Sequence, residues 1–124
     1  MSKKRILIIE DDPDVLEMMY MVLTEDGYNV VPSRDYWPLR DIKSLMPDLI
    51  LIDNWLAESD NKNICKKLKE GHDTKNIPII LVSGDPRVQQ MALESHANAF
   101  LSKPFDIAEL VAIARTWTGR AIDL

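Results

Sequence analysis

The sequence predicts a doubly wound α/β domain, in which helices cover both faces of a parallel sheet. Short apolar runs recur along the chain, at residues 5–9, 28–31, 48–53, 77–82 and 98–102. Continuous runs of this kind are typical of strands that are buried on both faces. The segments between them carry apolar residues at helical spacing. Five strands therefore alternate with five helices, which favours parallel pairing.

The first half of the chain contains start and stop signals for these elements. The dipeptide Asp12-Pro13 is typical of a helix N-cap followed by proline in the first turn. Gly27 is expected to end that helix, and Pro32 is expected to end the second strand. A short helix is expected at about residues 39–46, before the third strand begins.

The second half continues the same alternation. The third strand, at residues 48–53, is the most apolar in the chain and precedes a polar loop at residues 54–61. A helix around Cys65 follows, and another is expected at residues 87–96. Asp106 is placed to cap a last helix.

The composition limits the classes of protein that fit. The 124 residues are about the size of one domain, and 46% of them are apolar, which is enough for one sizeable core. The net charge of -5, with no basic run, argues against direct nucleic-acid binding. A lone cysteine, Cys65, cannot form an internal disulfide, so a cytoplasmic location is expected. No apolar stretch approaches the roughly 20 residues of a membrane span.

Polar side chains stand where four of the predicted strands end. Glu10 and Asp11 follow the first strand, Asp53 ends the third, Ser83 follows the fourth and Lys103 follows the fifth. Open α/β sheets bind their ligands at the carboxyl ends of the strands, so these side chains are expected to converge at one edge. The predicted site therefore combines carboxylates, a hydroxyl and an ammonium.

This set of groups suits phosphoryl transfer to a carboxylate. Neighbouring carboxylates repel one another unless a proton or a cation bridges them, and Mg²⁺ prefers oxygen ligands. A carboxylate can act as a nucleophile and form an acyl phosphate, whose oxygens then need positive charge and donors around them. Mg²⁺, Lys103 and Ser83 can supply these to Asp53. No histidine or second general base is evident in the site, so the phosphodonor is expected to be external.

Four segments resemble the motifs of the receiver domains of two-component response regulators. They are the acidic end of the first strand, the acceptor strand, the strand ending in a hydroxyl and a small residue, and a Lys-Pro motif with a cis-type peptide, at residues 8–12, 47–53, 80–84 and 100–105. The resemblance covers essentially the whole chain. It implies a flavodoxin-like (βα)5 fold with strand order 2-1-3-4-5, and one receiver domain at residues 1–124.

The resemblance also implies a metal site around the acceptor. Asp53 would be phosphorylated, and Asp11 and Asp53 would bind Mg²⁺ directly. Glu10 would bind the ion through water, and the backbone carbonyl of Trp55 would supply a further ligand.

Two further residues would contact the phosphoryl group, and a third would change its position in response to phosphorylation. Lys103 would pair with the phosphoryl group, Ser83 would swing towards it, and Phe100 would rotate inward as a switch. The surface formed by the fourth helix, fifth strand and fifth helix would then change its contacts with a downstream protein effector.

The resemblance implies partners as well. A sensor histidine kinase or a histidine phosphotransfer protein would donate the phosphate, and the kinase would dock mainly on the first helix and neighbouring loops. The chain would act as a monomer or as a phosphorylation-dependent dimer. It would have no contact with membranes and no enzymatic activity beyond its own phosphorylation and dephosphorylation.

The loop after the acceptor departs from the family pattern, because Ala57 stands where the family often has proline and a later glycine is absent. Two other hypotheses stay open. One is an interaction module that kept the fold without phosphorylation. The other is a hydrolase with an aspartyl-phosphate intermediate, which would need a cap domain or an acid at the position of Trp55.

Overall fold

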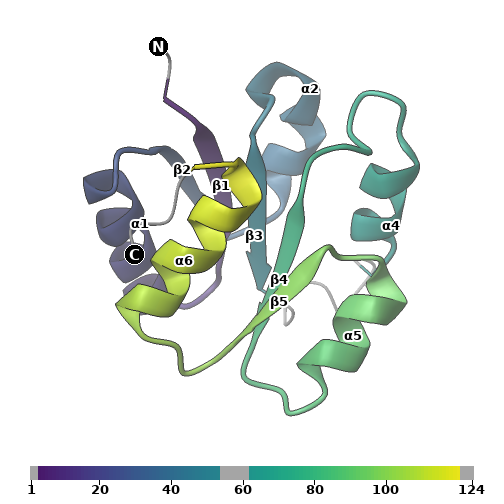
Figure 1. The fold of residues 1–124 in the computed structure, drawn as a ribbon. Coiled ribbons are helices and arrows are strands. Elements are labelled where there is room, and N and C mark those ends of the chain that lie inside the picture. Colours follow the sequence, from purple (N-terminus) through teal and green to yellow (C-terminus); the bar gives the residue numbers. More distant parts are fainter. Residues whose placement is uncertain (1–2, 54–61, 121–124) are drawn as a thin grey trace.

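Five parallel strands form the centre of the fold, in the order β2-β1-β3-β4-β5 (Figure 1). The strands are β1 (Arg5–Ile9), β2 (Asn29–Ser33), β3 (Leu49–Asp53), β4 (Ile79–Ser83) and β5 (Ala99–Ser102). The computed structural model describes residues 3–53 and 62–120, without the side chains of residues 62–64. The predicted parallel sheet and its strand order are confirmed.

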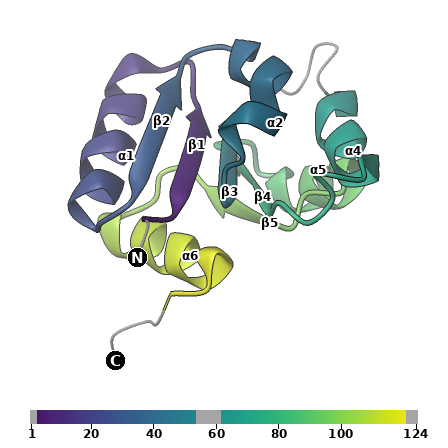
Figure 2. The same cartoon turned by 90° about the horizontal axis from the view of Figure 1, so that it is seen from above.

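Helices cover both faces of this sheet (Figure 2). One face is covered by α1 (Pro13–Glu25) and α6 (Ile107–Thr118), and the other by the 3-10 helix η1 (Trp37–Asp41), α2 (Ile42–Leu45), α4 (Lys62–Glu70) and α5 (Val88–Ser95). Alternate strand residues supply the two cores, because successive side chains of a strand point to opposite faces. In β1, Ile6 and Ile8 pack towards α1 and α6, whereas Leu7 and Ile9 pack towards the other helices.

The predicted helix caps are confirmed. The Asp12 carboxylate accepts hydrogen bonds from the backbone N–H groups of Asp14 (2.9 Å) and Val15 (3.2 Å) at the start of α1. Asp106 accepts one from the N–H of Glu109 (2.8 Å) at the start of α6. These carboxylates satisfy donors that have no partner within the first turn of a helix.

Three predicted boundaries are wrong, and each lies around a proline: the fourth strand, for example, begins at Ile79 and not at residue 77. The second strand does not stop at Pro32 but continues to Ser33. Proline is tolerated here because β2 is an edge strand, which needs backbone hydrogen bonds on one side only. The expected helix at 39–46 begins earlier, as η1 at Trp37, and its α-helical part is only Ile42–Leu45. The polar loop expected at residues 54–61 lies outside the described residues.

A charged cluster joins the C-terminal ends of α1 and α6. The Arg115 guanidinium donates to both carboxylate oxygens of Asp26, from Nε at 3.0 Å and from Nη2 at 2.6 Å. Arg120 donates to the Asp26 carbonyl (2.6 Å), and its guanidinium lies 4.7 Å from the centroid of the Tyr28 ring. Hydrogen bonding from Arg115 holds the pKa of the Asp26 carboxyl below its ordinary value. The cluster therefore fixes α6 against α1.

Replacing Asp26 with asparagine is expected to lower the free energy of unfolding by about 2 kcal/mol, because two charge-assisted hydrogen bonds from Arg115 are lost. Urea unfolding at neutral pH measures this, with Asp41→Asn, an exposed aspartate on η1, as the control. The pKa of Asp26 is lower in the folded chain, so its stabilising effect is present above the ordinary value of 3.8 and lost as pH falls through the folded value. A difference between wild type and variant that is as large in strong acid as at neutral pH would contradict this account.

Candidate functional site

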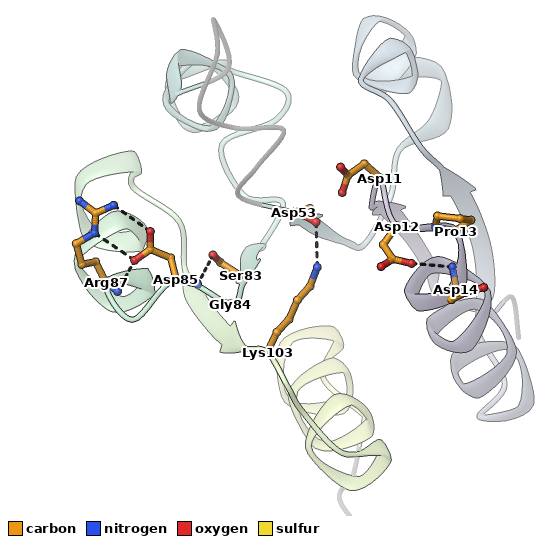
Figure 3. Close-up of a pocket in the computed structure, with 10 residues that line it drawn as sticks. All are labelled: Asp11, Asp12, Pro13, Asp14, Asp53, Ser83, Gly84, Asp85, Arg87 and Lys103. Carbon is orange, nitrogen blue, oxygen red and sulfur yellow. Dashed lines mark hydrogen bonds and ion pairs between the residues drawn. The ribbon is translucent and has the colours of Figure 1, made fainter.

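Three charged side chains meet at the carboxyl ends of the central strands. Glu10, Asp53 and Lys103 each lie an even number of residues after strand residues that pack towards α1 and α6. Their side chains are therefore directed to the same face of the sheet. Figure 3 shows the Lys103 side chain reaching towards Asp53 from the end of β5. The convergence predicted for these three residues is confirmed.

One lysine pairs with two buried carboxylates in this cluster. Lys103 Nζ lies 2.7 Å from Oε1 of Glu10 and 3.0 Å from Oδ2 of Asp53. Glu10 is 1% exposed and Asp53 is 5% exposed, so both acids are nearly removed from water. Burial and a hydrogen bond with Asp53 together raise the pKa of the Glu10 carboxyl to about 8, although the hydrogen bond from Lys103 lowers it. Burial alone would lower the pKa of the Lys103 ammonium, but its pairing with the two acids raises it.

The site also fits a hard divalent cation. Glu10, Asp11 and Asp53 each offer a carboxylate oxygen, and these three oxygens lie within 4.8 Å of one another. Oε1 of Glu10 is buried, and its charged neighbour is the Lys103 ammonium at 2.7 Å. A cation with oxygen ligands would relieve the repulsion among these three clustered carboxylates. Trp55, the fourth expected ligand, lies outside the described residues.

Ser83 stands at the end of β4, so that Asp53, at the end of β3, lies between Ser83 and Glu10. It is 6% exposed, and its Oγ accepts a hydrogen bond from the backbone N–H of Asp85 at 3.0 Å. Because the oxygen is the acceptor, the hydroxyl proton is available for a further acceptor. Asp53, Ser83 and Lys103 line one open cavity of about 850 Å³ (Figure 3). The cavity gives a small anion access to all three side chains.

Phe100, the expected switch residue, lies away from this ionic cluster. It is in β5, paired in register with Leu81, and it is 36% exposed. It lines a groove of about 280 Å³ between α5 and β5, together with Leu93, which is 67% exposed. The surface expected to change with phosphorylation therefore carries an apolar groove.

Three charged residues that line the cavity, Asp14, Asp85 and Arg87, were missed by the sequence analysis. Asp85 and Arg87 stand at the rim, just beyond the end of β4 (Figure 3). The available signal was their position within four residues of Ser83, at a strand end that the topology places beside Asp53.

The fold and the site together define a class of α/β domain: a doubly wound sheet with an acidic, lysine-paired site at the carboxyl edge of its strands. The model of the response regulator receiver domain family matches residues 6–115, and the chain belongs to this family. The resemblance noted in the sequence is thus confirmed. No helix in the described ranges is both long enough and apolar enough to cross a membrane.

The curated relatives are longer transcriptional regulators. The chain is 32% identical over 119 residues to the DNA-binding dual master transcriptional regulator RpaA of Synechocystis sp., covering 94% of this chain and 49% of that protein. It is 33% identical over 112 residues to the phosphate regulon transcriptional regulatory protein PhoB of Escherichia coli K12, covering 88% and 49%. The chain therefore spans about half the length of the curated relatives it matches.

Solved structures of similar proteins have the same fold. A putative response regulator from Chloroflexus aurantiacus matches with a TM-score of 0.86 and 31% identity, over 96% of this chain and 100% of that one. The receiver domain of the sensor histidine kinase PA1611 from Pseudomonas aeruginosa matches with a TM-score of 0.83 and 26% identity, over 95% and 99%. That structure has a magnesium ion coordinated in its active site cleft.

Proposed function

We propose that this chain is a phosphorylation-dependent signalling switch whose phosphoryl acceptor is Asp53. The observation that carries the proposal is the setting of this carboxylate. Asp53 is nearly buried at the end of β3, receives a hydrogen bond from Lys103 at 3.0 Å and faces an open cavity. Membership of the receiver family supports the same role.

Asp11 and Asp53 would hold Mg²⁺ directly, and Glu10 would hold it through water. When bound, the ion supplies positive charge to the oxygens of the transferring phosphoryl group. The clustering of the three carboxylates within 4.8 Å supports this assignment. A ligand from the carbonyl of Trp55 stays a prediction, because that residue lies outside the described part of the chain.

The side chains of this chain then have distinct tasks in the transfer. A carboxylate oxygen of Asp53 attacks phosphorus and forms a P–O bond, while the P–N bond of a phosphohistidine donor breaks and the imidazole retains its electron pair and takes up a proton. The Lys103 ammonium, already 3.0 Å from Asp53, bonds a phosphoryl oxygen. The Ser83 hydroxyl donates a hydrogen bond to another phosphoryl oxygen.

The switch would act by shifting a pre-existing equilibrium between two surfaces. Movement of Ser83 towards the phosphoryl group would let Phe100 turn inward from its half-exposed position beside α5. The donor would be a histidine kinase or a histidine phosphotransfer protein, and the output would be a changed contact with a protein effector. The named transcriptional regulators among the relatives support a role in signalling.

Incubation with phosphoramidate and Mg²⁺, followed by intact mass measurement, tests the proposed function. The expected result is a mass gain of one phosphoryl group, with release of ammonia. This mass gain should be absent when a chelator replaces Mg²⁺. An unchanged mass would reject the proposal and favour the phosphorylation-independent interaction module. Continuous release of phosphate from a metabolite would instead favour the hydrolase.

Magnesium binding can be tested separately from phosphorylation. Mg²⁺ at about ten times its dissociation constant is expected to stabilise the chain by about 1.4 kcal/mol, because it binds the folded state only. Asp11→Asn is expected to lose most of this effect, since it removes one of the three clustered carboxylates. Asp12→Asn is the matched control, because asparagine also caps helices well and Asp12 is occupied as the cap of α1. Equal stabilisation of both variants in thermal unfolding would exclude Asp11 as a ligand.

A further inference from the structure

The rim of the acceptor cavity carries an ion pair that the proposed function does not use. The Arg87 guanidinium donates to both carboxylate oxygens of Asp85, from Nε to Oδ1 at 3.1 Å and from Nη2 to Oδ2 at 2.9 Å. Such two-point pairing fixes the orientation of a carboxylate as well as balancing its charge. Both residues line the same cavity as Asp53 and Lys103.

The pair directs a carboxylate away from the acceptor. Figure 3 shows the Asp85 carboxylate turned towards Arg87, on the side away from Asp53. The backbone N–H of Arg87 also donates to Oδ1 of Asp85 (2.8 Å), but this contact alone holds only one oxygen. Without the guanidinium, this single backbone contact would be left to hold the Asp85 carboxylate, which could then turn towards the cavity that it lines.

The cavity is already rich in negative charge. Its lining includes five aspartates, against one lysine and one arginine, and they are Asp11, Asp12, Asp14, Asp53 and Asp85. A phosphodonor carries negative charge on its phosphoryl oxygens, so each carboxylate that faces it opposes its approach. The position of the Asp85 carboxylate therefore bears directly on the rate of phosphorylation.

We propose that Arg87 is a positioning residue for the phosphorylation of Asp53, acting by holding the Asp85 carboxylate turned away from the incoming phosphodonor. The proposal rests on the proposed function of Asp53. Arg87 would act through Asp85 and not through a contact of its own with Asp53. Asp85 is also joined to the reaction centre through its N–H, which donates to the Ser83 hydroxyl oxygen at 3.0 Å.

Initial rates of phosphorylation by acetyl phosphate, measured by mass at several donor concentrations in Mg²⁺, test this proposal. Arg87→Met is expected to lower the second-order rate constant roughly threefold to tenfold at low ionic strength, and less at high salt, because salt screens exposed charges. The initial rate of phosphorylation should rise less steeply with donor concentration in this variant, while the rate at saturating donor should change little. Arg40→Met, which removes an exposed arginine of η1 outside the cavity lining, is the matched control.

Two more variants separate positioning from a simple loss of charge. Arg87→Lys keeps the positive charge but cannot donate to both carboxylate oxygens in the fixed geometry of a guanidinium. Its rate of phosphorylation should therefore lie between those of wild type and Arg87→Met. In an Asp85→Asn background, Arg87→Met should cause little further loss, because no carboxylate remains to be released. An equal loss in both backgrounds, or a rate for Arg87→Met that matches Arg40→Met, would overturn the inference. If wild type itself gains no phosphoryl group, the proposed function fails first.

Discussion

Replacing Asp53 with asparagine is expected to abolish the gain of a phosphoryl group from phosphoramidate. The amide oxygen is a far weaker nucleophile than a carboxylate, and an acyl phosphate cannot form on it. The variant should remain folded, because asparagine has the same shape and its neutral amide removes the repulsion between Asp53 and Glu10. Intact mass measurement after incubation with donor and Mg²⁺ gives the result directly.

The control for this variant is Asp12→Asn, which makes the same chemical change at the edge of the same cavity. Asparagine can keep the helix cap that Asp12 provides, so phosphorylation should continue at a rate close to that of wild type. A full mass gain in Asp53→Asn would show that another residue is the acceptor, and the assignment of the site would be wrong.

Replacing Lys103 with methionine is expected to slow phosphorylation about a hundredfold or more, which is the usual cost of removing one donor to a developing anion. The Lys103 ammonium pairs with Asp53 at 3.0 Å and with Glu10 at 2.7 Å, so the variant also leaves two buried acids without their lysine. The free energy of unfolding is therefore expected to fall as well. Urea unfolding shows whether the variant is folded under the conditions of the rate measurement.

Lys43→Met controls for the change in net charge, because the Lys43 side chain is 78% exposed and pairs only loosely with Asp73, at 3.7 Å. Its phosphorylation rate should match that of wild type. If folded Lys103→Met gains phosphate as fast as Lys43→Met does, Lys103 is a structural partner of the buried acids and takes no part in the transfer.

The residues at the strand ends could be predicted because the parallel topology of the sheet determines where they lie. Once the strands are parallel, Glu10, Asp53 and Lys103 must stand at one edge, and an even spacing from the core residues directs them to one face. The sequence could not show that Glu10 would be 1% exposed and would lie 2.7 Å from Lys103. That burial, which raises the pKa of Glu10, is a property of the complete fold.

The errors and omissions have a common physical origin. Pro32 was expected to end a strand, but it is tolerated because β2 is at the edge of the sheet, and edge position is a property of the whole fold. The pairing of Asp85 with Arg87 depends on side-chain orientation in a loop, where no periodicity guides prediction. Local patterns thus predicted the elements and the main site, while three-dimensional context determined the strand end and the rim.

The chemical location of the phosphoryl group is the most direct test of the account. Sodium borohydride reduces an aspartyl phosphate to homoserine, so the modified position can be found by mass spectrometry of peptides. After treatment with phosphoramidate and Mg²⁺, homoserine is expected in place of Asp53 in the peptide that contains the end of β3. Homoserine at another aspartate, or none in a sample whose intact mass shows one phosphoryl group, would contradict the central role of Asp53.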